Sequence, residues 1–170
     1  MKNSVIDAVN HQIHLEFEAA FLYLNLSVEM QQYGLPGCSH WLRVQFGEEC
    51  SHALRLITYM GERRVAAEVP SVAPPPCVWE SPIDAFAAVL EHEKRVSASV
   101  DALVTLSRAE QDYATESIMM RYVQEQVEEE NAAADIVDCM RLAEGNRAGL
   151  LRIDRRMGKR KPGQRSDIRR

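Results

Sequence analysis

The chain is 170 residues long, which is enough for one domain with at most a small appendage. Hydrophobic residues make up 46% and charged residues 26% of it, a balance that excludes a disordered chain. Aromatic residues are only 6%, which is typical of a helical protein and not of a β-sandwich. The net charge of −5 is unevenly distributed, because residues 152–170 carry +7 and residues 1–151 carry −12. The acidic body disfavours nucleic acid as a partner, and the basic tail 152–170 leaves nucleic-acid binding open.

The sequence also indicates a compartment. No apolar run approaches the roughly 18 residues that cross a membrane, and the N-terminal stretch lacks the apolar segment of a signal peptide. Neither a CxxC pair nor a zinc-binding spacing occurs among Cys38, Cys50, Cys77 and Cys139. We therefore expect a cytoplasmic protein with free thiols and no membrane partner.

Apolar residues recur at helical spacing over four long stretches and one short one. We expect helices at about residues 5–33, 38–64, 82–107, 115–144 and 147–157. Ser81 is placed to cap the third helix, with Pro82 at its first position and Asp84 in its first turn. The first helix should stop at the Gly-Leu-Pro-Gly turn of residues 34–37, and the fourth at Gly145.

The connections predict the topology. Short links join the first helix to the second and the third to the fourth, so each pair should form an antiparallel hairpin. Residues 65–80 contain four Pro and reach about 53 Å when extended, longer than a helix of about 42 Å. We expect an all-α, ferritin-like up-down-down-up four-helix bundle with one long crossover and a short fifth helix. Residues 1–157 would form this domain, and residues 158–170 a disordered basic tail.

Four polar side chains lie on the apolar stripes where core residues are expected. Glu16, Glu49, Glu93 and Gln126 each fall about twelve residues into their helix, so they should meet near one height of the bundle. A single Glu on such a stripe usually reaches water at the edge of the helix. Four together require another explanation.

The charge of this set indicates metal ions. Carboxylates that face one another in an apolar core are costly, and no Lys or Arg lies on the stripes nearby, so either the acids are protonated or cations lie between them. Together with Glu129, the three glutamates carry four negative charges, which two divalent ions would cancel. Oxygen ligands with one imidazole suit iron or manganese, and zinc could compete. Glu49 and His52 have the i, i+3 spacing that di-iron bundles use.

The fourth helix departs from a symmetric pattern. It carries Gln126-x-x-Glu129 where a second Glu-x-x-His would be expected, so one metal ion should bind more loosely. Loose binding suits a site that passes iron on. A second acidic patch of Glu48, Glu125 and Glu128 flanks the first, and it is either a solvated acidic face or a third, weaker cation site that shares Glu129.

Several stretches resemble those of a known family. HLEFEAAFLY (14–23), GEECSHALRL (47–56), LEHEKRV (90–96) and RYVQEQVEEE (121–130) are similar to the bacterial non-haem ferritins, over about residues 3–155. The resemblance implies a ferroxidase that oxidises Fe(II) with O2 or H2O2. It also implies storage of ferric mineral in a hollow homo-oligomeric shell of 24 subunits.

The resemblance further implies a role for each site residue. Glu16, Glu49 and His52 would hold one iron of the two in each subunit. Glu49 would bridge to the second iron, which Glu93 and Glu129 would complete. The catalytic set would also include Gln126, which would lie beside the ligands or contact an oxygen species. Tyr23 would hydrogen-bond at the centre and could supply an electron. The third, weaker iron site would use four glutamates: Glu48, Glu125, Glu128 and Glu129.

Other functions of this fold stay open at this point. A di-iron peroxidase of the rubrerythrin type would keep its metals, but most such proteins carry a CxxC module that this chain lacks. The basic tail would suit a DNA-protecting miniferritin, although those proteins lack a fifth helix. A structural shell with an inactive centre is the third alternative. Haem is not expected, because the haem-binding bacterioferritins carry a Glu-x-x-His on the fourth helix that this sequence lacks.

Overall fold

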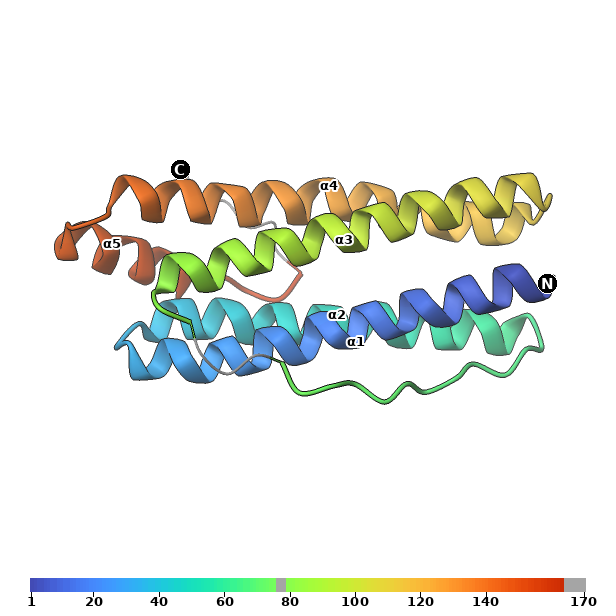
Figure 1. Ribbon diagram of the computed structural model, residues 1–170, viewed down its shortest axis with the longest axis horizontal. Coiled ribbons are helices and arrows are strands. Elements are labelled where there is room, and N and C mark those ends of the chain that lie inside the picture. The colour runs from blue at the N-terminus through green and yellow to red at the C-terminus, as the bar shows by residue number, and fades with distance from the viewer. Residues whose placement is uncertain (76–78, 164–170) are drawn as a thin grey trace.

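The computed structural model describes residues 1–75 and 79–163, and within these ranges it contains helices and no strand. Five helices follow one another: α1 Asn3–Gln32, α2 Pro36–Glu62, α3 Pro82–Ala109, α4 Tyr113–Leu142 and α5 Arg147–Met157 (Figure 1). These bounds lie within a few residues of those expected from the sequence. Cys77 and tail residues 164–170 lie outside the described residues.

The helices form two antiparallel hairpins, α1 with α2 and α3 with α4 (Figure 1). Residues 63–81 connect the hairpins, and their described part runs alongside the bundle back to the end where α1 meets α2 (Figure 1). Helix α3 then runs parallel to α2 and packs on α1. This arrangement confirms the up-down-down-up bundle with one long crossover. None of the helices in the described part of the chain combines the length and apolar character needed to cross a bilayer.

Three of the long helices end in the same backbone motif, which sets the direction of the chain after them. Gly34 takes a left-handed φ of 73°, and the next residue, Leu35, donates its N–H to the Met30 carbonyl at 2.9 Å. Arg64 and Gln111 hold the same place after α2 and α3, with φ of 58° and 56°. A non-glycine residue is disfavoured in this conformation, so these two ends are held by the packing that surrounds them.

The core is divided into two apolar clusters along the bundle axis. One is built around Trp41 and Phe86, and the other around Ile13 and Met119. Between them each long helix contributes buried polar residues instead of apolar ones. A polar layer therefore lies between two apolar clusters.

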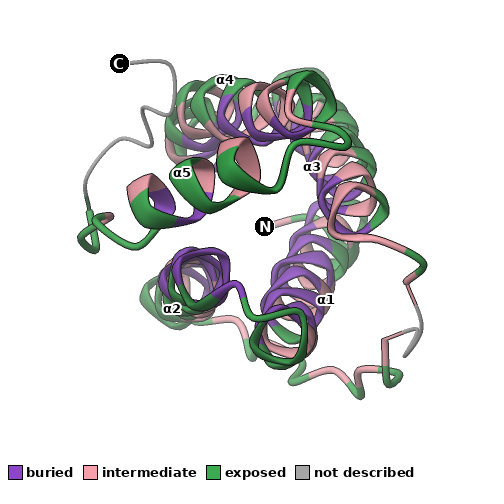
Figure 2. Cartoon of the chain, turned by 90° about the vertical axis from the view of Figure 1, so that its left-hand side faces the viewer, coloured by how far each residue is buried: buried purple, intermediate pink, exposed green. Residues whose placement is uncertain are grey.

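Helix α5 closes one end of the bundle, where it lies across the ends of α2 and α4 (Figure 2). The buried Asp154 carboxylate accepts a hydrogen bond from the Cys38 N–H at 2.8 Å, so it caps the N-terminus of α2. Gly37 makes this contact possible, because a Cβ there would lie 1.8 Å from the Asp154 carbonyl oxygen. After α5, residues 158–163 turn back along α2. The division into a domain of 1–157 and a disordered tail stays a prediction.

Candidate metal centre

The polar layer contains three side chains placed to bind one metal ion. Glu16, Glu49 and His52 each offer a ligand atom, and these atoms lie within 4.8 Å of one another. All three side chains are buried. Glu16 comes from α1, and the other two lie one turn apart on the same face of α2, as the i, i+3 spacing predicts.

His52 is held between the two carboxylates. Its Nδ1 atom lies 3.0 Å from Glu49 Oε2 and 3.6 Å from Glu16 Oε2. Burial disfavours the charged ring, but the two carboxylates outweigh it and raise the pKa of His52 to about 11. The Tyr122 ring packs against the imidazole, and its hydroxyl donates to the His52 carbonyl at 2.8 Å. The imidazole is therefore fixed in place and carries a proton that a metal ion would replace.

Two carboxylate oxygens of this cluster have no hydrogen-bond donor among the described residues. Glu16 Oε2 and Glu49 Oε1 are buried, and neither accepts a hydrogen bond. Burial, reinforced by Glu93 and Glu16, raises the pKa of Glu49, although His52 opposes the shift. Buried oxygens left without donors are costly, and a divalent cation is the partner that would satisfy them. The donor set fits iron, manganese or zinc.

Glu93, on α3, lies beside this cluster and is held by two neighbours. The Tyr23 hydroxyl donates to Glu93 Oε1, and the Gln126 amide donates to Glu93 Oε2 at 3.0 Å. Burial and the charge of Glu129 raise the pKa of Glu93 to about 7, against the hydrogen bond from Tyr23. Burial and the adjacent carboxylates also raise the pKa of Tyr23, so it remains a neutral phenol. Both amide and phenol orient the carboxylate.

Glu129 approaches from α4 and is half-buried. Its Oε2 atom accepts a hydrogen bond from the Gln45 amide at 2.9 Å. Burial raises the pKa of Glu129, while the charge of Arg160 opposes the shift. The five predicted ligands and Gln126 are thus brought into one layer of the bundle, each from the helix expected.

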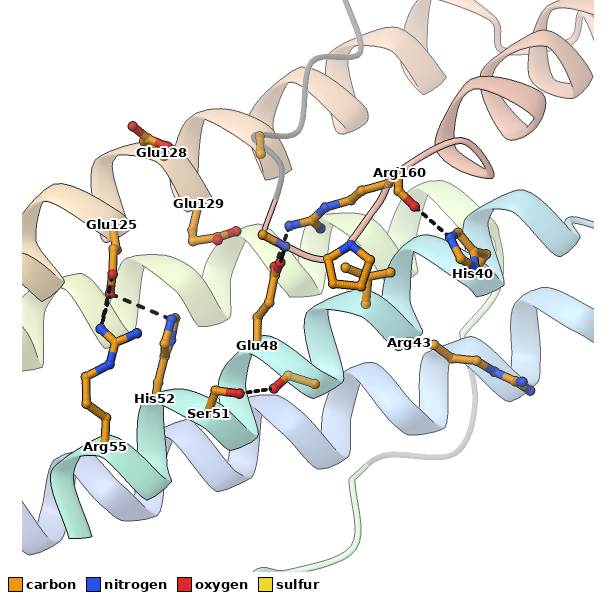
Figure 3. A pocket seen from close by; sticks show the side chains of 15 residues that line it. His40, Arg43, Glu48, Ser51, His52, Arg55, Glu125, Glu128, Glu129 and Arg160 are labelled. Carbon is orange, nitrogen blue, oxygen red and sulfur yellow. Dashed lines mark hydrogen bonds and ion pairs between the residues drawn. The ribbon is translucent and has the colours of Figure 1, made fainter. Parts of the chain in front are cut away.

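A pocket of about 650 Å³ opens beside this layer, between α2 and α4 (Figure 3). Three acidic residues of the predicted third site line it, together with Glu129: Glu48, Glu125 and Glu128. They are not equivalent. Glu125 pairs with Arg55 at 3.0 Å and lies 3.7 Å from His52 Nε2, while Glu128 points away from Glu48 and Glu129 (Figure 3). Glu48 pairs with Arg160 at 2.5 Å. The apolar stripes of the helices gave no indication of this arginine.

Four residues of this region were not anticipated as parts of the site. Gln12 donates to Glu16 at 2.8 Å, Gln45 orients Glu129, Tyr122 supports His52, and Arg160 enters the pocket. Gln12 lies one turn before Glu16, and Gln45 one turn before Glu49, so a buried glutamine at i−4 from a buried glutamate was the available signal. Arg160 lies on no apolar stripe, and no sequence signal pointed to its role.

Known proteins are similar to this chain in sequence and in fold. Residues 6–143 match the family model of the ferritin-like domain. The chain belongs to the ferritin family. It is 39% identical to a bacterial non-heme ferritin of Bacteroides fragilis, over 91% of this chain and 96% of that protein. It is 34% identical to the bacterial non-heme ferritin of Campylobacter jejuni, over 91% of this chain and 92% of that protein.

Solved ferritins have the same fold. An open pore ferritin from the archaeon Archaeoglobus fulgidus superposes with a TM-score of 0.93 at 37% sequence identity, covering 95% of this chain and 99% of that one. An engineered closed form of the same ferritin gives 0.92 at 38% identity, covering 95% of this chain and 98% of that one. The resemblance to bacterial non-haem ferritins and the ferritin-like fold expected from the sequence are both confirmed.

Proposed function

We propose that this ferritin is an iron store with ferroxidase activity, which oxidises Fe(II) at the buried polar layer. The observation that carries the proposal is the set of buried oxygens without donors beside a histidine, in a chain related to bacterial non-heme ferritins. Glu16, Glu49 and His52 bind one Fe(II). Glu49 also contacts a second, which Glu93 and Glu129 complete.

The residues around the ligands set the chemistry. Carboxylates favour Fe(III) over Fe(II), because it is harder and more highly charged, so they promote loss of an electron. Two Fe(II) ions supply two electrons, and O2 takes these with two protons to form H2O2. The apolar clusters limit access of water along the bundle axis, while Tyr23 and Gln126 hold Glu93 in place. Gln126 offers only an amide, which is a weaker metal ligand than a carboxylate or an imidazole. The second ion is therefore released more readily than the first.

The ferric product is stored as a mineral in a homo-oligomeric shell, for which we propose 24 subunits in the cytoplasm. The relatives named as ferritins support this assembly. A decisive experiment adds Fe(II) in air at about one hundred ions per chain and counts the iron in the protein peak after gel filtration. Iron far above three per chain in a large particle supports storage. Two per chain in a small oligomer would refute storage and indicate a di-iron enzyme.

The oxidation site is tested by two variants with matched controls. Glu49→Ala and His52→Ala should each slow the initial oxidation of Fe(II) by at least about tenfold while the particle stays assembled. Glu62→Ala, at the exposed end of α2, and His11→Ala, exposed on α1, should oxidise iron at the wild-type rate. Wild-type rates in the first two variants would place the oxidation elsewhere.

A further inference from the structure

The C-terminal segment places an arginine inside the acidic pocket between α2 and α4. Arg160 follows α5, in the most basic part of the chain, where side chains are expected to extend into water. Its side chain is nevertheless only 6% exposed. Figure 3 shows it entering the pocket from the segment after α5, toward Glu48 and Glu129. A buried arginine of this kind needs compensating partners.

Arg160 has such partners on α2. Its Nη2 atom lies 2.5 Å from Glu48 Oε2, and its Nη1 donates to Gln45 Oε1. The guanidinium stacks over the Trp41 ring, 4.8 Å from the centroid, and the Arg160 carbonyl lies 2.8 Å from His40 Nε2. Side chain and backbone are both held, so the segment is docked through this residue.

The docked segment uses both oxygens of Glu48. Oε2 faces Arg160, and Oε1 accepts the Gly163 N–H at 2.9 Å. Gln45 then connects Arg160 to the metal layer, because it accepts from Arg160 and donates to Glu129 Oε2 at 2.9 Å. The two acidic groups that face each other across the pocket are therefore both engaged, Glu48 directly and Glu129 through an amide.

We propose that Arg160 is a built-in cation of this pocket: while residues 158–163 are docked, its guanidinium stands in for a metal ion beside Glu48 and Glu129 and closes the pocket to a third ion. A guanidinium carries a positive charge and five N–H donors, so it competes with metal cations for the same carboxylate oxygens. This inference rests on the proposed function only for the identity of the metal. The pocket and its arginine are independent of it.

Competition of this kind is reciprocal. If docking of Arg160 weakens binding of a third ion, then binding of that ion must weaken docking of the segment by the same factor. The C-terminal segment would thus regulate how many cations the chain holds next to the oxidation site. Removing the guanidinium should strengthen binding of the third ion about tenfold or more, within the range of ordinary coupling between sites.

The test counts ions bound to the intact protein and does not depend on oxidation. Terbium(III) is the probe, since it is a hard cation that prefers oxygen ligands and emits when excited through a nearby tryptophan. Trp41 stacks on Arg160, so an ion that replaces the guanidinium would lie close to this ring. Equilibrium dialysis gives the number of ions per chain, and the tryptophan-excited emission reports the pocket.

Four variants complete the experiment. Arg160→Ala should bind one terbium more per chain than the wild type and emit more strongly, and Arg160→Gln should do the same if the first variant folds poorly. Glu48→Gln added to Arg160→Ala should remove the extra ion. Arg155→Ala, which deletes an exposed arginine of α5, should match the wild type.

The outcomes separate the two proposals. Equal numbers of ions in the wild type and both Arg160 variants would overturn the role of Arg160, as would an extra ion that survives Glu48→Gln. Absence of the two ions expected at Glu16, Glu49 and Glu93 would count against the oxidation site alone. The difference of one ion between Arg160→Ala and the wild type would still decide the role of Arg160.

Discussion

Replacing Glu93 by Gln should stabilise the metal-free protein while it impairs the metal centre. The pKa of Glu93 is about 7 in the fold, raised by burial from an ordinary value of 4.5. Folding therefore favours the protonated carboxyl. The resulting penalty is absent below about pH 4.5, grows as the pH rises through 7, and is complete above it.

The size of the effect follows from that shift. Each pKa unit corresponds to 1.36 kcal/mol, so ionisation of Glu93 costs the fold about 3 kcal/mol at pH 8. The new amide offers one oxygen and one NH2 group where Glu93 offers two oxygens. Its oxygen accepts a weaker hydrogen bond from Tyr23, and Gln126 must turn its own amide to accept from the NH2, which together offset about 1 kcal/mol of the gain. The net stabilisation of Glu93→Gln at pH 8 should be about 2 kcal/mol, and at pH 4.5 the variant should be no more stable than the wild type.

Urea unfolding of chelator-treated protein at the two pH values measures this difference. Glu91→Gln is the matched control, because Glu91 lies on the same helix with its side chain 70% exposed. Its unfolding free energy should stay within about 0.5 kcal/mol of the wild type. If Glu93→Gln and the wild type have equal stability at pH 8, burial does not penalise this carboxylate and the electrostatic reasoning is wrong. The same variant should oxidise Fe(II) more slowly.

Further predictions concern the ends of the helices and the support of the centre. Gly37→Ala should push α5 off the bundle and lower the free energy of unfolding, measured by thermal denaturation, by about 1–3 kcal/mol, since its Cβ would lie 1.8 Å from the Asp154 carbonyl oxygen. The control Gly47→Ala has open space around its Cβ and should not destabilise the protein. Gln111→Gly should raise the unfolding free energy by about 1 kcal/mol, because it relieves a left-handed φ of 56°. Tyr122→Phe should lower the unfolding free energy by about 1 kcal/mol, since a buried hydrogen bond from its hydroxyl to the His52 carbonyl is lost. Unchanged stability would show that the hydroxyl contributes nothing. Metal binding should release protons in weakly buffered solution and weaken as the pH falls from 8 to 5, because ions replace protons on the ligands, and a pH-independent affinity in calorimetry would contradict protonation of the metal-free centre.

The sequence was sufficient for the features that depend on local periodicity. Apolar residues at helical spacing, Pro82 and the Gly-Leu-Pro-Gly turn predict the helices and their ends. Glu49 and His52 at i, i+3 must share one face of a helix, whatever surrounds them. Buried carboxylates at matched depths also require a common partner, which is why Glu16 and Glu93 could be predicted as ligands from the sequence alone.

Only the tertiary structure decided how these groups are supported and which cations balance them. Gln12 and Gln45 are ordinary polar residues in the sequence, and their roles depend on which carboxylate the packing places beside them. Arg160 reaches Glu48 from 112 positions further along the chain, after a helix that lies across the end of the bundle. Helical periodicity carries no information about such a contact, because it is set by the docking of α5 through Asp154 and Gly37 and not by any local pattern.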